Sequence, residues 1–440
     1  MGIIHPEAFH VVKDEFTLGS DMLAGVAASF QKEMALGLSG TGKSSLRMLK
    51  SYIGLPTGKE TGEYLALDFG GTNVRVLRIL LEGNGRYQIL KKAAKPLRVE
   101  GGYDCVGAGS TAGQLFDFLA ALIDEAVDGN RSDTFLLGHT FSFPSSQASL
   151  RDARLISWTK EFAVSGVEGR FVNELLQRAL VRRNIRNVRP VAVINDTVAV
   201  LLSAAYRRGN TCIGSIYATG HNTCYLEADH CNVPMILNLE SGNFAKVPQN
   251  RFDCWLDARS EKPGEQLLEK MVAGRYIGDI FGVALAELLG EPGGFYPFTS
   301  VDISGIIAEG TDSLDRAAEI LNAKTNKAFG REDAAMAREL AVSVVVRSAR
   351  LVGACFAGIL RHMGKDGTTR QHIAVDGSVY EKMPLAKENI QAAICELLGA
   401  AGDTVDTVLE SGGSGIGAAI AAAMANAETG SFQMKAGDKF

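Results

Sequence analysis

The sequence predicts an α/β fold with two or more domains. A chain of 440 residues, 46% of them hydrophobic, is long enough to bury more than one core. Its apolar runs are typical of strands buried on both faces, and the most telling of them opens directly into a helix, as in open α/β sheets. Two similar strand–turn–strand segments, one in each half of the chain, indicate a duplicated fold that grips phosphates between its halves.

The segment over residues 191–200, VAVINDTVAV, combines a buried strand at 191–194 with a helix-like run that follows at once. Open α/β sheets place their ligands where a strand's carboxyl end opens into a helix. Asp196 lies at this junction, where a carboxylate meets little water and suits a general base. The alternative interpretation is that Asn195, Asp196 or Thr197 only caps the helix.

Composition and charge argue against several function classes. The net charge is -5 with both signs dispersed, so no basic face indicates nucleic acid and no polybasic cluster indicates an anionic membrane. No apolar run approaches the ~20 residues that span a bilayer, and the N-terminus lacks a signal-peptide core. The seven cysteines form no C-x-x-C pair, which favours reduced thiols in the cytoplasm over disulfides or a zinc site.

Apolar periodicity predicts the other elements in order. We expect helices in the segment that carries Glu269, in the alanine-rich C-terminal segment, and at 21–36, 113–127, 171–183, 198–205, 283–289, 334–356 and 390–398. We expect strands before Glu240 and at 64–68, 74–81, 135–138, 153–156, 211–217, 372–376 and 405–409. The first helix has Ser20 or Asp21 as a plausible cap, and residues 336–357 are apolar enough for a central helix.

Two glycine-containing turns are candidates for phosphate binding. The first is FGGTN at 69–73, between two predicted strands, and the second contains Thr219 and Gly220. Glycine lets backbone amides approach phosphate oxygens without obstruction by a Cβ atom. Asp68 ends the strand before the first turn and could orient a magnesium ion through water. Taken singly, each turn also reads as an ordinary hairpin.

Two nucleotide-binding patterns are misleading here. GLSGTGKS at 37–44 fits the P-loop pattern, but a predicted helix precedes it where a strand is needed, so Lys43 is interpreted as a solvated loop residue. GSGIGA at 413–418 fits a dinucleotide fingerprint, but only 22 residues follow it, too few for the second half of that unit. We interpret it as a flexible glycine entry to the last helix and a candidate hinge.

Nine segments in order resemble the hexokinase family, the sugar kinases of the actin-like ATPase fold. The resemblance covers nearly the whole chain, and it rests on EFTLGSDMLAGVAASFQKEMALGL, LPTGKETGEYLALDFGGTNVRVL, LGHTFSFPSSQ with LISWTKEFAVSGVEG, VAVINDTVAV, ATGHNTCYLE, NLESGNF, PGEQLLEKMVAGRYIG, VDGSVY and GGSGIGAA. It implies an α/β, two-domain, ribonuclease H-like fold with a small and a large lobe around a deep cleft. It also implies transfer of the γ-phosphate of Mg-ATP to the 6-hydroxyl of a hexose.

The resemblance implies a role for each matching residue. Asp196 would take the proton from the 6-hydroxyl, and Lys160 would lie close to the transferring phosphoryl group. The hexose would be bound by Ser142, Thr159, Lys160, Asn195, Asp196, Asn222, Glu240 and Glu269. ATP would be bound by Gly70, Gly71, Thr72, Asn73 and Arg75, by Thr219 and Gly220, and by Gly377 and Ser378 beside the adenosine. Asp68 would help to hold Mg²⁺.

Elementary chemistry agrees with these roles, because phosphoryl transfer needs positioning and charge neutralisation more than covalent help. Five positions depart from the family pattern. Ser241 stands where an aromatic residue is usual, and His221 replaces a small residue or cysteine beside the sugar and phosphate. Lys262 and Glu265 replace Asn and Gln, and Ile416 replaces a basic residue. These departures concern the sugar preference more than the core chemistry.

We expect a small domain of about residues 58–197 completed by 412–440, and a large domain of 198–411 completed by 1–57. Two other functions remain open at this point. One is a catalytically silent hexose sensor on the same fold, and the other is a P-loop ATPase that uses Lys43. The preferred hexose and the oligomeric state are not predicted.

Overall fold

A computed structural model describes residues 2–159, 162–308, 314–364 and 367–437 of the protein, with side chains up to residue 427 in the last helix. The chain forms two compact units. The first unit comprises residues 1–48, 215–223 and 239–409, and the second comprises residues 49–214, 224–238 and 410–440. The domain limits given above stay a prediction, since they concern functional lobes.

The second unit is built around a five-stranded sheet with the order β4-β3-β2-β5-β8. Its strands are β2 (Thr61–Phe69), β3 (Asn73–Gly83), β4 (Arg86–Pro96), β5 (Phe135–Phe141) and β8 (Val188–Ile194). β2, β3 and β4 pair antiparallel, whereas β2, β5 and β8 pair parallel. The parallel half is the part that brings strand ends together at one edge.

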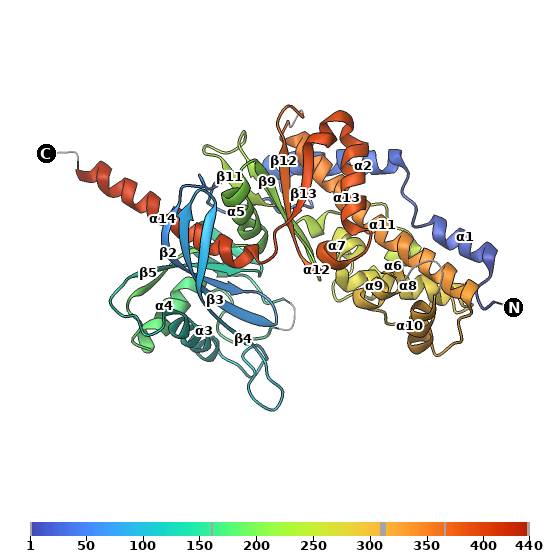
Figure 1. Ribbon diagram of the computed structural model, residues 1–440, viewed down its shortest axis with the longest axis horizontal. Helices are drawn as coiled ribbons and strands as arrows, with labels where there is room; N and C mark the ends of the chain where they lie inside the picture. The colour runs from blue at the N-terminus through green and yellow to red at the C-terminus, as the bar shows by residue number, and fades with distance from the viewer. Residues whose placement is uncertain (1, 160–161, 309–313, 365–366, 438–440) are drawn as a thin grey trace. The chain divides into compact units, whose positions relative to one another are not determined.

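Helices cover both faces of this sheet (Figure 1). Leu65, Leu67 and Phe69 of β2 belong to the core cluster with α3 (Ala112–Val127) and α4 (Val172–Arg182). Tyr64 and Ala66, which alternate with these residues along β2, belong to a second core cluster, with α5 (Asp196–Arg208) and α14 (Gly413–Gly437). Since alternate strand residues face opposite sides, burial on both faces explains why these strands read as continuous apolar runs.

Glycines let α14 pack directly against the sheet and against α5. A Cβ atom on Gly138 of β5 would lie 1.8 Å from the Ala418 carbonyl oxygen. A Cβ atom on Gly417 would lie 2.0 Å from the Ala199 carbonyl oxygen. Close packing therefore explains this part of the 413–418 glycine pattern better than the flexibility that we predicted, and Ile416 is buried in the same cluster.

Short strands complete the second unit. β1 (Leu49–Lys50) and the 224–227 part of β10 (His221–Glu227) each pair antiparallel with β11 (Met235–Asn238). β6 (Ser145–Ser149) and β7 (Asp152–Leu155) form a separate antiparallel pair.

The first unit is mostly helical. Its helices are α1 (Pro6–Asp14), α2 (Ser20–Leu38), α6 (Arg251–Arg259), α7 (Leu267–Val272), α8 (Gly274–Leu288), α9 (Ser300–Ala308), α10 (Asp315–Thr325), α11 (Arg331–His362), α12 (Ser378–Lys382) and α13 (Ala386–Leu398). Two 3₁₀ turns are η1 (Ser241–Asn243) and η2 (Gly399–Thr404). β12 (Gln371–Asp376) and β13 (Val405–Leu409) pair parallel beside the end of β9 (Thr211–Tyr217).

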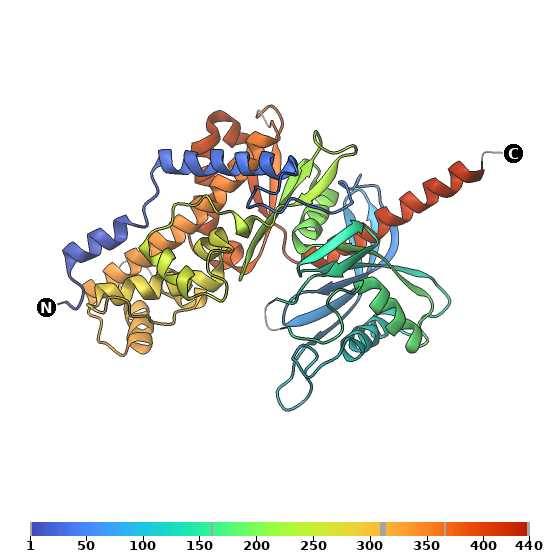
Figure 2. The same cartoon turned by 180° about the vertical axis from the view of Figure 1, so that it is seen from behind.

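The long helix α11 is the core of the first unit, with α2, α8 and α13 packed against it (Figure 2). Among the described residues it is the one helix long and apolar enough to cross a membrane, although 78% of its most apolar window is buried inside the protein. We expected no apolar run long enough to span a bilayer, and by length and composition α11 corrects that expectation. A mostly buried core helix passes the same test, and its burial here agrees with the central position that we predicted.

The predicted elements agree with the observed ones best where the apolar period is strong. β9 and β13 begin and end where we predicted. The cap of α2 was wrong, because Gly19 occupies the N-cap position without a side-chain hydrogen bond. α1, α9, α10 and β4 were not predicted, and α8 starts nine residues earlier than 283.

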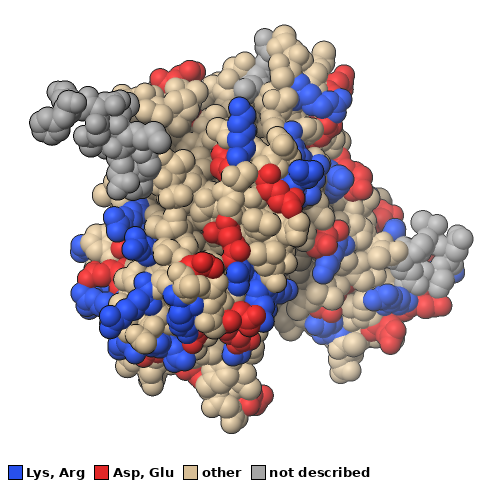
Figure 3. Space-filling view, turned by 60° about the vertical axis from the view of Figure 1, so that its left-hand side comes forward, with Lys and Arg blue, Asp and Glu red and all other residues tan. Residues whose placement is uncertain are grey.

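On the face drawn in Figure 3, basic and acidic side chains are interspersed.

Candidate active site

The carboxyl ends of three neighbouring parallel strands define one edge of the five-stranded sheet. Phe69 of β2 pairs with Phe141 of β5, and Thr140 pairs with Ile194 of β8. The chain therefore delivers Gly70, Ser142 and Asn195 to the same edge, directly after their strands. Open α/β sheets bind ligands at this edge, so the structure brings three predicted site segments together within the second unit.

The loop after β2 lies very close to Ser142. A Cβ atom on Gly70 would lie 2.7 Å from both Cβ and Oγ of Ser142, so only glycine fits there. Gly71 has nothing within 4 Å of its Cβ position, and Thr72 and Asn73 are exposed. The loop thus presents open backbone to solvent at the end of a buried strand, which is the geometry that suits phosphate oxygens.

Asp68 forms an ion pair with Arg75, from the neighbouring strand β3. An Arg75 guanidinium nitrogen lies 2.5 Å from Asp68 Oδ2, and the Asp68 side chain is 14% exposed. The pair fixes both side chains beside the loop at 70–73. A carboxylate held at this position is a suitable outer partner for a hydrated Mg²⁺ ion, the role that we predicted for Asp68.

Asn195 and Asp196 stand at the start of α5. Their contacts are compatible with both interpretations of this segment, a helix cap and a general base. Asn195 is the N-cap residue: its Oδ1 accepts hydrogen bonds from Thr197 N at 3.0 Å and Thr197 Oγ1 at 2.8 Å. Asp196 occupies the first helical position, half-buried, and one of its oxygens accepts a bond from Thr197 N at 2.8 Å. The positive end of the helix favours negative charge at Asp196.

A buried carboxylate ties α5 to the segment that enters α14. Glu410 is fully buried, and its Oε1 accepts hydrogen bonds from Ser203 Oγ at 2.7 Å and Arg207 Nη1 at 2.9 Å. Because Ser203 and Arg207 lie on α5, this network fixes the helix whose first residue is Asp196.

Three predicted hexose ligands lie together in the first unit. Asn222 Nδ2 donates to Glu240 Oε1 at 3.3 Å, and Asn222 Oδ1 accepts from Ser241 N at 3.2 Å. Glu269 Oε2 accepts from His221 N at 3.0 Å. A Cβ atom on Gly242 would lie 3.0 Å from Glu269 Cβ, so this glycine brings η1 and α7 into close contact.

Two residues in this cluster have strained backbones. Glu240 has φ 51° and Gln266 has φ 54°, both in the left-handed region that non-glycine residues rarely adopt. Such strain persists at functional sites because the surrounding structure enforces it. Gln266 precedes α7, the helix that carries Glu269, and sequence reasoning missed it. Its only signal was the preceding Pro263-Gly264 turn, which marks a reversal but not the residue after it.

The second predicted phosphate turn joins β9 to β10. Within it Ala218 N donates to Gly220 O at 3.0 Å, and Gly274 N at the start of α8 donates to Ala218 O at 2.8 Å. Gly377 has φ 131°, and a Cβ atom on it would lie 2.4 Å from the Tyr217 carbonyl oxygen. Thr219, Gly220, Gly377 and Ser378 therefore come from two adjacent turns of the first unit.

The His221 side chain, which we expected beside the sugar and phosphate, points into the interior of the first unit. It is buried, its ring packs edge-on to Tyr217, and its Nδ1 lies 3.1 Å from Ile216 O. Alternate residues of β10 face opposite sides, so the ring points away from Asn222. Burial lowers the pKa of His221 to about 4. Only its backbone N–H serves the candidate site, by holding Glu269.

Three further positions that the sequence singled out are Ser241, Thr159 and Lys160. Ser241 is buried, and its hydroxyl has no hydrogen-bond partner among the described residues. Thr159 is half-buried, next to Trp158, whose indole N–H donates to Val164 O at 2.9 Å. Lys160, predicted as a catalytic and hexose-binding residue, lies outside the described residues.

The P-loop-like segment is a loop, as predicted. α2 precedes it and only the short strand β1 follows, while Lys43 is exposed. The buried Glu33 organises the loop by accepting hydrogen bonds from Ser45 N at 2.6 Å, Ser45 Oγ at 2.9 Å and Ser44 Oγ at 3.2 Å. Ser44, the last residue of the pattern, and Ser45 directly after it thus bind a carboxylate of the protein, which argues against a phosphate site there.

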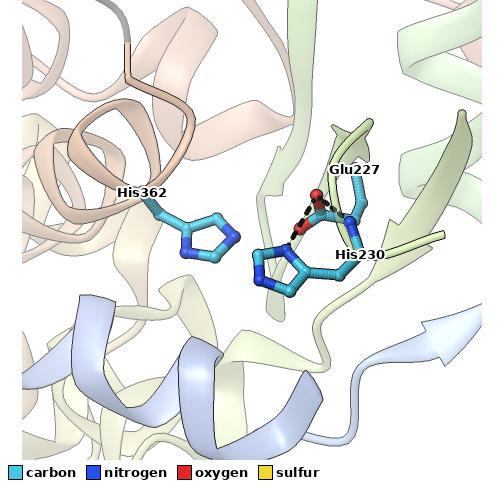
Figure 4. A group of neighbouring side chains, drawn as sticks. All are labelled: Glu227, His230 and His362. Atoms are coloured by element: carbon cyan, nitrogen blue, oxygen red, sulfur yellow. Dashed lines mark hydrogen bonds and ion pairs between the residues drawn. The ribbon is translucent and has the colours of Figure 1, made fainter. Parts of the chain in front are cut away.

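A second polar cluster lies at the far end of β10. The buried Glu227 carboxylate accepts hydrogen bonds from the Tyr225 hydroxyl at 2.6 Å and from Asp229 N at 2.8 Å, and it faces the imidazole of His230 (Figure 4). These bonds hold the turn after the strand. We therefore assign this carboxylate to the local structure rather than to the candidate active site.

Comparison with known proteins identifies similarity over most of the chain. A family model described as hexokinase matches residues 8–206, and a second one with the same description matches residues 212–424. Hexokinase-1 of Schizosaccharomyces pombe is 33% identical, over 94% of this chain and 90% of its own length. Hexokinase-1 of Oryza sativa subsp. japonica is 37% identical, over 91% of this chain and 87% of its own length.

Solved structures agree with the sequence matches. A crystal structure of a hexokinase has a TM-score of 0.85 and 31% identity, covering 95% of this chain and 99% of its own. The hexokinase of Schistosoma mansoni complexed with glucose has a TM-score of 0.80 and 30% identity, with the same coverage. The predicted two-domain α/β fold of the actin-like ATPase class is therefore confirmed.

Proposed function

The chain belongs to the hexokinase family, and from this premise we propose that it transfers the γ-phosphoryl group of ATP to the 6-hydroxyl of a hexose. The observation that carries the proposal is the pair of clusters described above. One unit holds a half-buried carboxylate at a helix start and an open glycine turn, both at the same edge of its sheet. The other holds Asn222, Glu240 and Glu269 together.

We propose that Asp196 is the general base. Its carboxylate would accept the proton of the 6-hydroxyl as that oxygen bonds to the γ-phosphorus, while the bond to the bridging oxygen breaks and ADP leaves. The Asn195 cap and the Glu410 network support this role, because they fix α5 and hence the position of its first residue.

Hexose binding would fall to carboxylates and amides. Glu240 and Glu269 accept hydrogen bonds only, so each can hold sugar hydroxyls as donors, whereas an amide such as Asn222 can also donate. We further propose Ser142, Thr159, Lys160 and Asn195 as hexose ligands. The edge position of Ser142 and Asn195 supports this assignment, while that of Lys160 rests on its motif alone.

ATP would be held by the two turns. The phosphates would be bound by Gly70, Gly71, Thr72, Asn73 and Arg75 and by Thr219 and Gly220, with Gly377 and Ser378 beside the adenosine. The open Cβ position of Gly71 supports this fit. Mg²⁺ bound with ATP neutralises phosphate charge, and Asp68 would hold it through water. The seven cysteines are unpaired, which supports the reducing cytoplasm as the proposed compartment.

A coupled assay for ADP release tests the proposal. The purified chain is given Mg-ATP with glucose, mannose, fructose or glucosamine in turn. We expect hexose-dependent ADP release with at least one sugar and only slow release without sugar. ADP release at the same rate with and without sugar, or no ADP release with any hexose, would contradict the proposal. Hexose binding without ADP release would instead support a silent sensor.

A further inference from the structure

A buried lysine, Lys270, follows directly after Glu269, a residue of the proposed hexose cluster. It lies on α7, and its side chain is only 5% exposed. Its Nζ lies 2.6 Å from Asp257 Oδ1 and 2.7 Å from the carbonyl oxygen of Lys262. A lysine is almost never buried without such partners, so these contacts fix its position tightly.

Asp257 connects this lysine to the loop over residues 260–266, which we term the α6–α7 loop. Both Asp257 oxygens accept a hydrogen bond from Gly264 N, each at 3.0 Å. Gly264 has φ 82°, a turn geometry that suits glycine. The loop is thus held at two backbone points, the Lys262 carbonyl oxygen and the Gly264 N–H, by one buried ion pair.

The loop ends in the strained residue that begins the hexose-binding helix. Gln266 has φ 54°, and its carbonyl oxygen accepts a hydrogen bond from Lys270 N at 3.0 Å. The helix α7 has only six residues, so it has little rigidity of its own. Its orientation, and that of Glu269, therefore depends on what holds the loop before it.

We propose that Lys270 is a positioning residue for hexose binding, which acts with Asp257 by fixing the α6–α7 loop and so aiming Glu269 at the sugar. The inference rests on the proposed function, because it gives that function's hexose cluster its support. Lys262 and Glu265, the two departures in this loop, are both exposed. The loop is therefore held by its backbone, which tolerates such changes of side chain.

Three variants separate this role from general stability. Lys270→Met removes the cation, and Asp257→Asn removes the negative charge with little change of shape. Arg350→Met is the matched control, because the Arg350–Glu396 pair, at 2.8 Å, joins α11 to α13 in the same unit. Hexose affinity is measured by titration calorimetry with glucose, and KM values and kcat are measured with Mg-ATP, alongside the melting temperature.

We expect Lys270→Met to raise the Kd and KM for hexose about tenfold or more, because a small displacement of a positioning group has effects of that size. The KM for Mg-ATP and kcat at saturating hexose should stay within about twofold, the pattern of lost uniform binding. Asp257→Asn should act in the same direction, and Arg350→Met should lower the melting temperature without changing the Kd for hexose.

The inference is overturned if Lys270→Met and Asp257→Asn bind hexose as tightly as the parent chain, or if Arg350→Met weakens hexose binding equally. Should Lys270→Met fail to fold, Asp257→Asn decides by the same criterion. Calorimetry does not require turnover, so a parent chain that binds glucose without phosphorylating it would refute the proposed function alone. A parent chain that binds no hexose would refute both.

Discussion

The two units hold their candidate site residues in different ways. In the second unit, Gly70, Ser142 and Asn195 follow directly on parallel strands that are buried on both faces. In the first unit, Glu240 and Gln266 have left-handed backbones in irregular segments: Glu240 lies between β11 and η1, and Gln266 lies between α6 and α7. The second unit thus positions its groups through regular structure, whereas the first relies on hydrogen bonds, an ion pair and strain. Substitutions should therefore act differently in the two units.

The largest effect is expected from Asp196→Asn, in the second unit. Loss of the proposed base should lower kcat by about 100-fold or more, with hexose binding largely kept. Initial rates of ADP release with glucose and Mg-ATP measure the change. Glu174→Gln is the matched control, since Glu174 is also an acid in the first turn of a helix of this unit, α4. An Asp196→Asn protein with normal turnover would remove Asp196 from the mechanism.

The second largest effect is expected from Gly138→Ala, which tests whether close backbone packing stabilises the second unit. Gly138→Ala places a methyl group against the Ala418 carbonyl oxygen, so we expect the free energy of unfolding to fall by about 3 kcal/mol. Urea titration followed by circular dichroism measures it. Gly113→Ala is the control, because its Cβ meets only Thr111 Oγ1 at 3.8 Å. Equal stability of the two variants would show that α14 has room to move away.

Each unit also buries one neutral histidine, which allows a comparison by pH. Burial lowers the pKa of His139 and of His221 to about 4, from an ordinary value of 6.5. Between these values the unfolded chain binds protons that the folded chain excludes, so stability falls as the pH falls from 6.5 to 4. Each histidine should contribute about 1.4 kcal/mol per pH unit across this window.

Substitution of His139 by phenylalanine tests that contribution, because His139 packs among Phe69 and Phe141. The His139→Phe protein should lose less stability between pH 7 and pH 5 than the parent chain, as measured by urea midpoints. Parallel pH profiles for the parent and His139→Phe proteins would show that folding does not lower the pKa of this histidine.

The smallest effect is expected at the misleading P-loop pattern. Lys43 is exposed, and the neighbouring serines bind Glu33, so Lys43→Ala should leave the KM for Mg-ATP within about twofold of the parent value. Steady-state kinetics at saturating glucose checks this. A large loss of ATP affinity would restore the P-loop interpretation that we rejected.

The same contrast explains how much could be predicted from the sequence. A strong apolar period located β8, β9 and β13, and the polar residues after buried strands identified the sheet edge with Asn195 and Asp196. The hexokinase motifs supplied Asn222, Glu240 and Glu269, and the structure brings these three together.

What could not be predicted depends on tertiary contacts. The left-handed backbone of Gln266 and the burial of Lys270 depend on tertiary contacts, such as that of Lys270 with Asp257, and no local pattern reports them. The His221 ring was expected at the sugar, but its position on β10 turns it into the interior. The 413–418 glycines read as a hinge because the helix packed against them was not visible in the sequence.

Phosphorus NMR of the reaction products tests the central claim most directly. The parent chain, incubated with glucose and Mg-ATP, should convert ATP into ADP and an equal amount of a phosphate monoester on the sugar 6-oxygen. Formation of inorganic phosphate in place of the sugar ester, or persistence of ATP while glucose is bound, would contradict the proposed phosphoryl transfer to a hexose.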